Sequence, residues 1–139
     1  MDKKLLPEGY IRFLQKLDEA NDGCPDYEFI YGEGLVTSGV LWNTKACESY
    51  SFSETEMDYA YFRNNDDFDW ADFDTFDGDS TLSNQEIDES LTIGLVDEGF
   101  IIINTHDQSV WMIFSDYFMA KCADSFDDFL EKKSKLKGK

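Results

Sequence analysis

The sequence predicts an α+β fold, in which a mostly antiparallel sheet of about five to six strands is packed by an N-terminal and a C-terminal helix. Three observations support this prediction. Apolar residues recur at helical spacing near the N-terminus, β-branched and aromatic runs follow one another through residues 91–114, and a capped amphipathic segment lies at residues 125–130. The 139 residues have the length of a single domain, and 42% of them are hydrophobic, which is enough to form a core.

The N-terminal helix is expected to begin at Pro7, because proline suits the first turn of a helix. Asn21, Asp22 and Gly23 provide a stop signal after it. The apolar residues between these limits fall on one stripe, which should face the sheet: Tyr10, Ile11, Phe13, Leu14 and Leu17.

Five runs of residues have the composition of strands. Residues 27–31 and 35–42 form one expected hairpin, and residues 91–96 and 100–104 form another, joined by Asp97-Glu98-Gly99. A turn at residues 105–108 leads into residues 110–114. Two of the last three runs are apolar on both faces, so both faces of the sheet should be covered.

The C-terminal helix should supply part of that cover. Asp124 or Ser125 is a suitable N-cap, and Phe126, Phe129 and Leu130 share one helical face. A further helix is expected over residues 53–63 from a cap-like Ser-Glu-Thr-Glu sequence. Residues 132–139 form a basic tail, whose lysines complement the helix dipole and whose last four or five residues should fray.

Residues 66–89 are an acidic, aromatic-rich excursion without any lysine or arginine. Aromatic side chains beside like charges suit a hydrophobic anchor ringed by steering groups, which makes this segment the candidate partner-binding edge. The alternative is a surface excursion whose aromatic rings pack on the core and whose carboxylates stay in water. The candidate partner-binding residues are Asp66, Asp67, Asp69, Trp70, Asp72, Phe73, Asp74, Asp77 and Asp79.

The charge of the chain narrows the kind of partner. The formal net charge is −18, and five of the twelve basic residues lie in the tail, so residues 1–131 carry −23. Such a field repels nucleic acids and anionic membranes, and it accelerates association with basic proteins. Neither a signal sequence nor an apolar run of membrane-spanning length is present, which favours a cytoplasmic location.

No residue pattern predicts catalysis, a metal or a cofactor. An EF-hand placed on Gly78 fails because Phe73, Thr75 and Asn84 would occupy ligand positions, which leaves only an irregular calcium site at Asp74, Asp77 and Asp79 as an alternative. His106 is the only histidine, and the three cysteines Cys24, Cys47 and Cys122 form no metal-binding or disulfide pattern. A carboxylate-pair hydrolase stays open simply because there are thirty acidic residues.

Two stretches resemble the SUKH superfamily, which includes the fungal Smi/Knr regulators of cell-wall synthesis and bacterial toxin-immunity proteins. The first is Leu6-Pro7-Glu8-Gly9-Tyr10 with Phe13-Leu14 and then Asn21-Asp22-Gly23, which is similar to the opening helix of that family. The second is similar to the closing strands and terminal helix of that family. It comprises Ile93-Gly94, Asp97-Glu98-Gly99-Phe100, Val110-Trp111 and Ala123-Asp124-Ser125-Phe126-Asp127-Asp128-Phe129-Leu130. Residues 43–89 match no part of the family's pattern.

The resemblance implies a single SUKH-like domain over residues 1–139 that is not an enzyme and acts by binding a protein. The implied function is immunity against a toxin, for instance a nuclease, or regulation of cell-wall or glucan synthesis. A basic toxin that binds phosphate would be attracted to this acidic chain. The alternative from charge alone is a nucleic-acid mimic that occupies basic DNA-binding proteins. Oligomeric state is not predicted.

Overall fold

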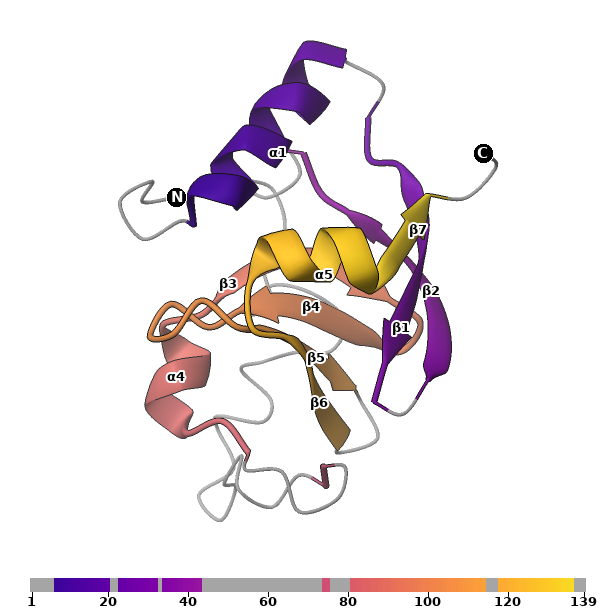
Figure 1. Ribbon diagram of the computed structural model, residues 1–139. Helices are drawn as coiled ribbons and strands as arrows, with labels where there is room; N and C mark the ends of the chain where they lie inside the picture. Colours follow the sequence, from indigo (N-terminus) through magenta and orange to yellow (C-terminus); the bar gives the residue numbers. More distant parts are fainter. Residues whose placement is uncertain are drawn as a thin grey trace.

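The computed structural model describes residues 7–20, 23–32, 34–43, 74–75, 81–114 and 118–136. In these residues it shows an α+β fold with a seven-stranded antiparallel sheet and three helices (Figure 1). The strands lie in the order β6-β5-β4-β3-β2-β1-β7. The elements are α1 (Glu8–Ala20), β1 (Asp26–Tyr31), β2 (Leu35–Leu41), α4 (Asn84–Asp88), β3 (Leu91–Val96), β4 (Gly99–Ile103), β5 (Val110–Phe114), β6 (Phe118–Ala123), α5 (Phe126–Lys132) and β7 (Ser134–Leu136).

Both predicted hairpins are confirmed. β1 pairs with β2 in a register that sets Tyr31 opposite Leu35, and β3 pairs with β4 so that Val96 faces Gly99. The β3–β4 turn contains only Asp97 and Glu98, because Gly99 already belongs to β4. Glu98, the second residue of this turn, takes a φ of 60°, in the left-handed region that residues other than glycine rarely adopt.

The sheet is curled so strongly that distant strands meet. β1 and β6 stand five places apart in the strand order, yet they contact each other. The rings of Tyr31 on β1 and Phe114 on β5 also approach to 5.2 Å between centroids. The curl therefore brings the β1–β2 hairpin next to the end of the β5–β6 pair.

Two glycines allow β2 and β3 to approach closely. A Cβ atom on Gly39 would lie 2.1 Å from the Leu95 carbonyl oxygen, and one on Gly94 would lie 2.2 Å from that of Val40. A bulge at Ile93 shifts the register of β3 against β4 beside this contact, and bulges increase the local twist of a strand. Any other residue at either glycine would push the two strands apart.

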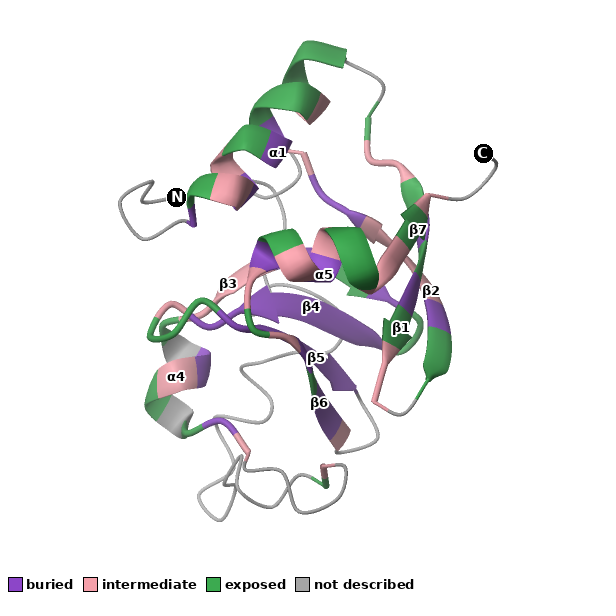
Figure 2. Cartoon of the chain, viewed as in Figure 1, coloured by how far each residue is buried: buried purple, intermediate pink, exposed green. Residues whose placement is uncertain are grey.

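Apolar side chains occupy both faces of the central strands, as their sequences predict. Figure 2 shows β4 and β5 buried along their whole length. One face forms the larger core beneath α1 and α5, where Phe126 contacts Tyr10 and Phe13 with ring centroids 5.0 and 5.3 Å apart. The opposite face forms a second core with the segment before β3: Leu82, Ile87, Phe100, Ile102, Trp111, Ile113 and Met119.

The two predicted terminal helices are also confirmed. Ser125 is the N-cap of α5, and its Oγ accepts a hydrogen bond of 3.1 Å from the Asp128 N–H. Phe126 and Phe129 are buried, whereas Leu130 is half-buried. Gly9 lets α1 approach α5, because a Cβ there would lie 2.0 Å from Asp127 Oδ1. None of the described helices has the length and apolar character needed to cross a membrane.

The expected number of strands is too low, since the sheet has seven. β6 is not predicted from the sequence because two alanines and a lysine weaken its strand pattern, and it forms by pairing with β5. β7 lies within the basic tail, where Lys133 O accepts a hydrogen bond of 2.8 Å from the Ile30 N–H beside the β1–β7 pairing. α4 lies within the acidic excursion, and the helix expected over residues 53–63 falls outside the described residues.

Candidate functional site

Asp74 is the one predicted partner-binding residue that the structure describes. The other eight, Asp66, Asp67, Asp69, Trp70, Asp72, Phe73, Asp77 and Asp79, lie outside the described residues. Asp74 is exposed and forms a parallel β-bridge with Phe118, and its carbonyl oxygen accepts a hydrogen bond of 3.0 Å from the Met119 N–H. The acidic segment is therefore attached to the sheet at the beginning of β6.

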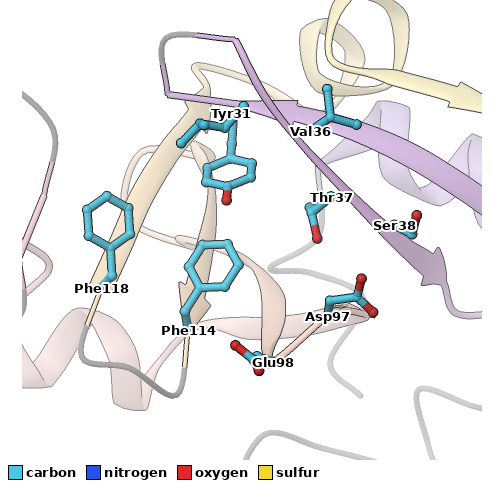
Figure 3. A pocket seen from close by; sticks show the side chains of 9 residues that line it. Tyr31, Val36, Thr37, Ser38, Asp97, Glu98, Phe114 and Phe118 are labelled. Atoms are coloured by element: carbon cyan, nitrogen blue, oxygen red, sulfur yellow. The ribbon is translucent and has the colours of Figure 1, made fainter.

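Phe118 also lines a hollow of about 530 Å³ between the β1–β2 hairpin and the end of the β5–β6 pair. The curl of the sheet creates this hollow, because it brings together residues that are distant in sequence. Figure 3 shows the rings of Tyr31, Phe114 and Phe118 on one side and Thr37, Ser38 and Asp97 on the other. The complete lining is Tyr31, Leu35, Val36, Thr37, Ser38, Asp97, Glu98, Phe114 and Phe118.

The apolar part of the hollow faces solvent to an unusual degree. Leu35 keeps 47% of its surface exposed and Val36 keeps 58%, and they are two of the four large apolar residues described as exposed. Phe114 contacts both neighbouring rings, with centroids 5.2 Å from Tyr31 and 6.2 Å from Phe118. Exposed apolar groups beside a rigid aromatic cluster are typical of a protein-binding surface.

The polar part of the hollow is acidic. Asp97 and Glu98 lie in the exposed β3–β4 turn, and the lining of described residues contains no lysine or arginine. A second hollow of about 210 Å³ lies on the other side of Asp97 and includes Asp26 as well as Ser38, Gly39 and Val40. Three carboxylates thus border neighbouring concave surfaces along β2.

Sequence reasoning missed the hollow. Asp97 and Glu98 have the composition of an ordinary hairpin connection, and Leu35 and Val36 have that of an ordinary strand. Their shared location depends on the curl, which the sequence signals only through Gly39 and Gly94. A glycine in each of two adjacent strands indicates a bend or a close backbone approach, and that signal could have pointed here.

A separate polar cluster joins α4 to the β4–β5 turn. Asn104 Nδ2 donates a hydrogen bond of 2.7 Å to Glu86 Oε2, and the Thr105 hydroxyl donates one of 3.0 Å to the Glu89 carbonyl oxygen. Burial raises the pKa of Glu86, but hydrogen bonds from the Ser83 N–H, the Asn104 amide and the Ser83 hydroxyl outweigh it, so the pKa is lowered overall. These contacts hold α4 against the second core.

His106 and Ser109 lie in this turn but do not form a catalytic pair. The His106 Nε2 atom contacts Glu89 Oε2, and hydrogen bonds from Gln85 and then His106 lower the pKa of Glu89. The Ser109 hydroxyl donates to Asp107 Oδ1 at 2.5 Å and accepts from the Trp111 indole N–H at 2.8 Å. Ser109 is buried and its hydroxyl donates to Asp107, whereas His106 contacts Glu89, so the two residues do not form a serine–histidine pair.

Burial also affects the described cysteines. It raises the pKa of the Cys122 thiol to about 12, so this sulfur stays protonated and unreactive at neutral pH. Cys24 is half-buried and its sulfur accepts a hydrogen bond of 3.4 Å from the Asn43 N–H. The described residues contain no cluster of three or more histidine, cysteine or acidic side chains arranged for a metal ion. Cys47, Asp77 and Asp79 lie outside them.

Comparisons with protein-family models, with curated proteins and with solved structures gave no match to this chain.

Proposed function

We propose that this chain is a non-enzymatic protein-binding domain whose partner is a basic protein, and that its role is that of an immunity protein neutralising a toxin. The observation that carries the proposal is the hollow, which combines exposed apolar residues with Asp97 and Glu98 and has no lysine or arginine among the described residues of its lining. An apolar anchor surrounded by carboxylates complements a basic protein surface. The resemblance to SUKH domains supports the same conclusion, and regulation of cell-wall synthesis is the second role it suggests.

The position of Asp74 supports an extended interface. Its bridge to Phe118 places Asp74 beside a residue that lines the hollow, and the chain as a whole carries a charge of −18. Attraction over this acidic surface accelerates encounter, whereas the hollow supplies the contacts that prolong the complex. Fast association should therefore depend on the acidic segment, and slow dissociation on the hollow.

Three described carboxyl groups have pKa shifts opposite to the shift that a general acid needs. A general acid needs a carboxyl group whose pKa is raised by burial. In Glu86, Glu89 and Asp107 the pKa is lowered instead, and hydrogen bonds from Ser109 outweigh burial in the case of Asp107. These three groups stay ionised at neutral pH and serve to fix α4 and the β4–β5 turn.

The test is affinity capture with the tagged protein from lysate of its source cells, together with the product of the neighbouring gene, at about 50 and about 200 mM salt. We expect one basic protein that remains bound at the higher salt and loses its activity at a one-to-one ratio. Asp97→Lys with Glu98→Lys should abolish capture, whereas the matched Glu19→Lys with Glu131→Lys, on exposed sites of α1 and α5, should not.

Charge reversal of the acidic segment tests whether the rate of association depends on this segment. Lysine at Asp69, Asp72, Asp74 and Asp77 should slow association with the captured protein and reduce its salt dependence, leaving dissociation nearly unchanged. Capture of many basic proteins, all released by salt and none inhibited, would replace the immunity proposal with the nucleic-acid mimic. Equal capture by the hollow variant and its control would remove the hollow from the interface.

A further inference from the structure

Among the described residues, no strand pairs with part of the β2 edge that borders the hollow. β3 pairs with β2 only at Gly39, Val40 and Leu41, and the chain then turns away through Asp97 and Glu98 into β4. The last contact is a hydrogen bond of 3.1 Å from the Asp97 N–H to the Ser38 carbonyl oxygen. Before Ser38, the described pairing of β2 is with β1.

The alternation of hydrogen bonds shows which backbone groups face this open edge. Ser38 accepts from Asp97, and the Trp42 N–H donates to Ile93 O at 2.8 Å, so the even-numbered residues of β2 face the β3 side. Val36 belongs to this set. Its N–H and C=O therefore point outward from the open edge. Among the described residues, neither group has a hydrogen-bond partner.

The surroundings of Val36 define what could pair there. In a strand that hydrogen-bonds with Val36, one residue would pair with Val36 directly. The residues just before and just after it would place their side chains on the same face as Leu35 and Thr37, which line the hollow. Within that hollow a cation would meet Asp97 and Glu98, and an apolar group would meet Tyr31 and Phe114. A second copy of the chain is a poor occupant, because it would bring another charge of −18 and another pair of these carboxylates to the same place.

We infer that the open edge of β2 at Val36 is a strand-addition site, which takes an extended segment of a basic partner with a lysine or arginine next to Asp97 and Glu98. Main-chain hydrogen bonds to Val36 would supply direction and register, and the hollow would select alternate side chains. The expected recognition pattern is one basic and one apolar residue, two positions apart in the partner segment. This inference rests on the proposed function and adds the mode of recognition to it.

The direct test uses a defined probe, a capped nine-residue peptide in which threonines alternate with lysine and valine. Titration into the ¹⁵N-labelled protein should shift the amide signals of Val36 and Glu98 saturably and slow hydrogen exchange at Val36. Asp97→Asn with Glu98→Gln should weaken binding about tenfold through loss of the charge-assisted contacts. The matched pair Glu19→Gln with Glu131→Gln should stay within about twofold of wild type, because it removes the same charge far from the site.

A peptide N-methylated at alternate backbone positions keeps its charge and loses its donors, so it should not shift Val36. Equal binding of this peptide, or shifts scattered over the acidic surface, would overturn strand addition and leave a purely electrostatic contact. Absence of any binding would overturn it as well.

Binding of the captured partner to variants at Val36 tests this inference separately from the proposed function. Val36→Pro removes the outward N–H on an edge where proline is tolerated, and Val36→Thr keeps it. Loss of the partner with Val36→Pro but not with Val36→Thr supports strand addition, provided that both variants keep the wild-type melting temperature. The opposite result would be a Val36→Pro variant that binds the partner with full affinity and an Asp97→Lys with Glu98→Lys variant that does not bind it. That result would refute strand addition and leave the proposed binding function intact.

Discussion

Glu86 shows how a single carboxylate stabilises the contact between α4 and the sheet. It forms both halves of a capping box with Ser83, and its second oxygen accepts from Asn104. Since its pKa is lowered in the folded state, its contribution is present above the ordinary glutamate value of 4.5 and is lost as the pH falls through the lower folded value.

We predict that in Glu86→Gln the free energy of unfolding falls less steeply than in wild type as the pH is lowered. Glutamine can still cap α4, but it does not titrate, so the stability advantage of wild type should shrink steadily as the pH falls below about 4.5. Urea unfolding at several pH values from neutral to acidic would measure this. Ser83→Ala, which removes one of the hydrogen bonds, should give an intermediate slope; a constant difference at every pH would contradict the prediction.

At the scale of elements, the junction of β2 and β3 depends on two glycines. On intrinsic strand preference, Gly94→Ala should stabilise a strand by roughly 0.5–1 kcal/mol. Here the new Cβ would lie 2.2 Å from the Val40 carbonyl oxygen, which is fixed backbone. We therefore expect destabilisation of about 2 kcal/mol or more, measured by chemical denaturation.

Gly23→Ala is a useful comparison for Gly94→Ala. Gly23 has a φ of +80° but no atom within 4 Å of an added Cβ, so alanine there carries only the conformational strain of about 1–2 kcal/mol. Binding of the partner distinguishes the two variants as well. Gly94→Ala should displace β2, alter the hollow and weaken partner binding, whereas Gly23→Ala should not. A stabilising effect of Gly94→Ala would refute the close approach.

Elements with a strong local pattern could be predicted, and those that depend on neighbours could not. The stripe from Tyr10 to Leu17 and the cap at Ser125 contain their own signals, so α1 and α5 were predictable. β7 has only three residues and forms because β1 offers it an edge. The hollow depends on contacts between residues as far apart as Tyr31 and Phe114, which no local pattern encodes.

For the whole molecule, charge should oppose folding. Ion pairs offset little of the net charge of −18: the described ones are exposed, as in Arg12–Asp127 with 56% and 65% of each side chain accessible, and exposed pairs contribute little. Self-repulsion of the acidic surface is long-ranged and screened by salt.

We predict that raising NaCl from about 20 to about 300 mM increases the melting temperature by a few degrees, equivalent to roughly 1 kcal/mol. Circular dichroism melts with a chelator present would measure this while excluding divalent cations. Charge reversal of Asp69, Asp72, Asp74 and Asp77 should reduce the salt effect. A melting temperature that falls with salt would show that attractive pairs dominate instead.

The pairing of β1 with β7 also has a kinetic consequence. Tyr27 pairs with Leu136, so β1 gains its outer neighbour only after nearly the whole described chain is available. A ribosome delivers residues in order, and during synthesis the outer edge of β1 stays open until residues 134–136 emerge. An open edge can pair with another nascent chain, so we expect β1 to be exposed to such pairing until β7 has been synthesised.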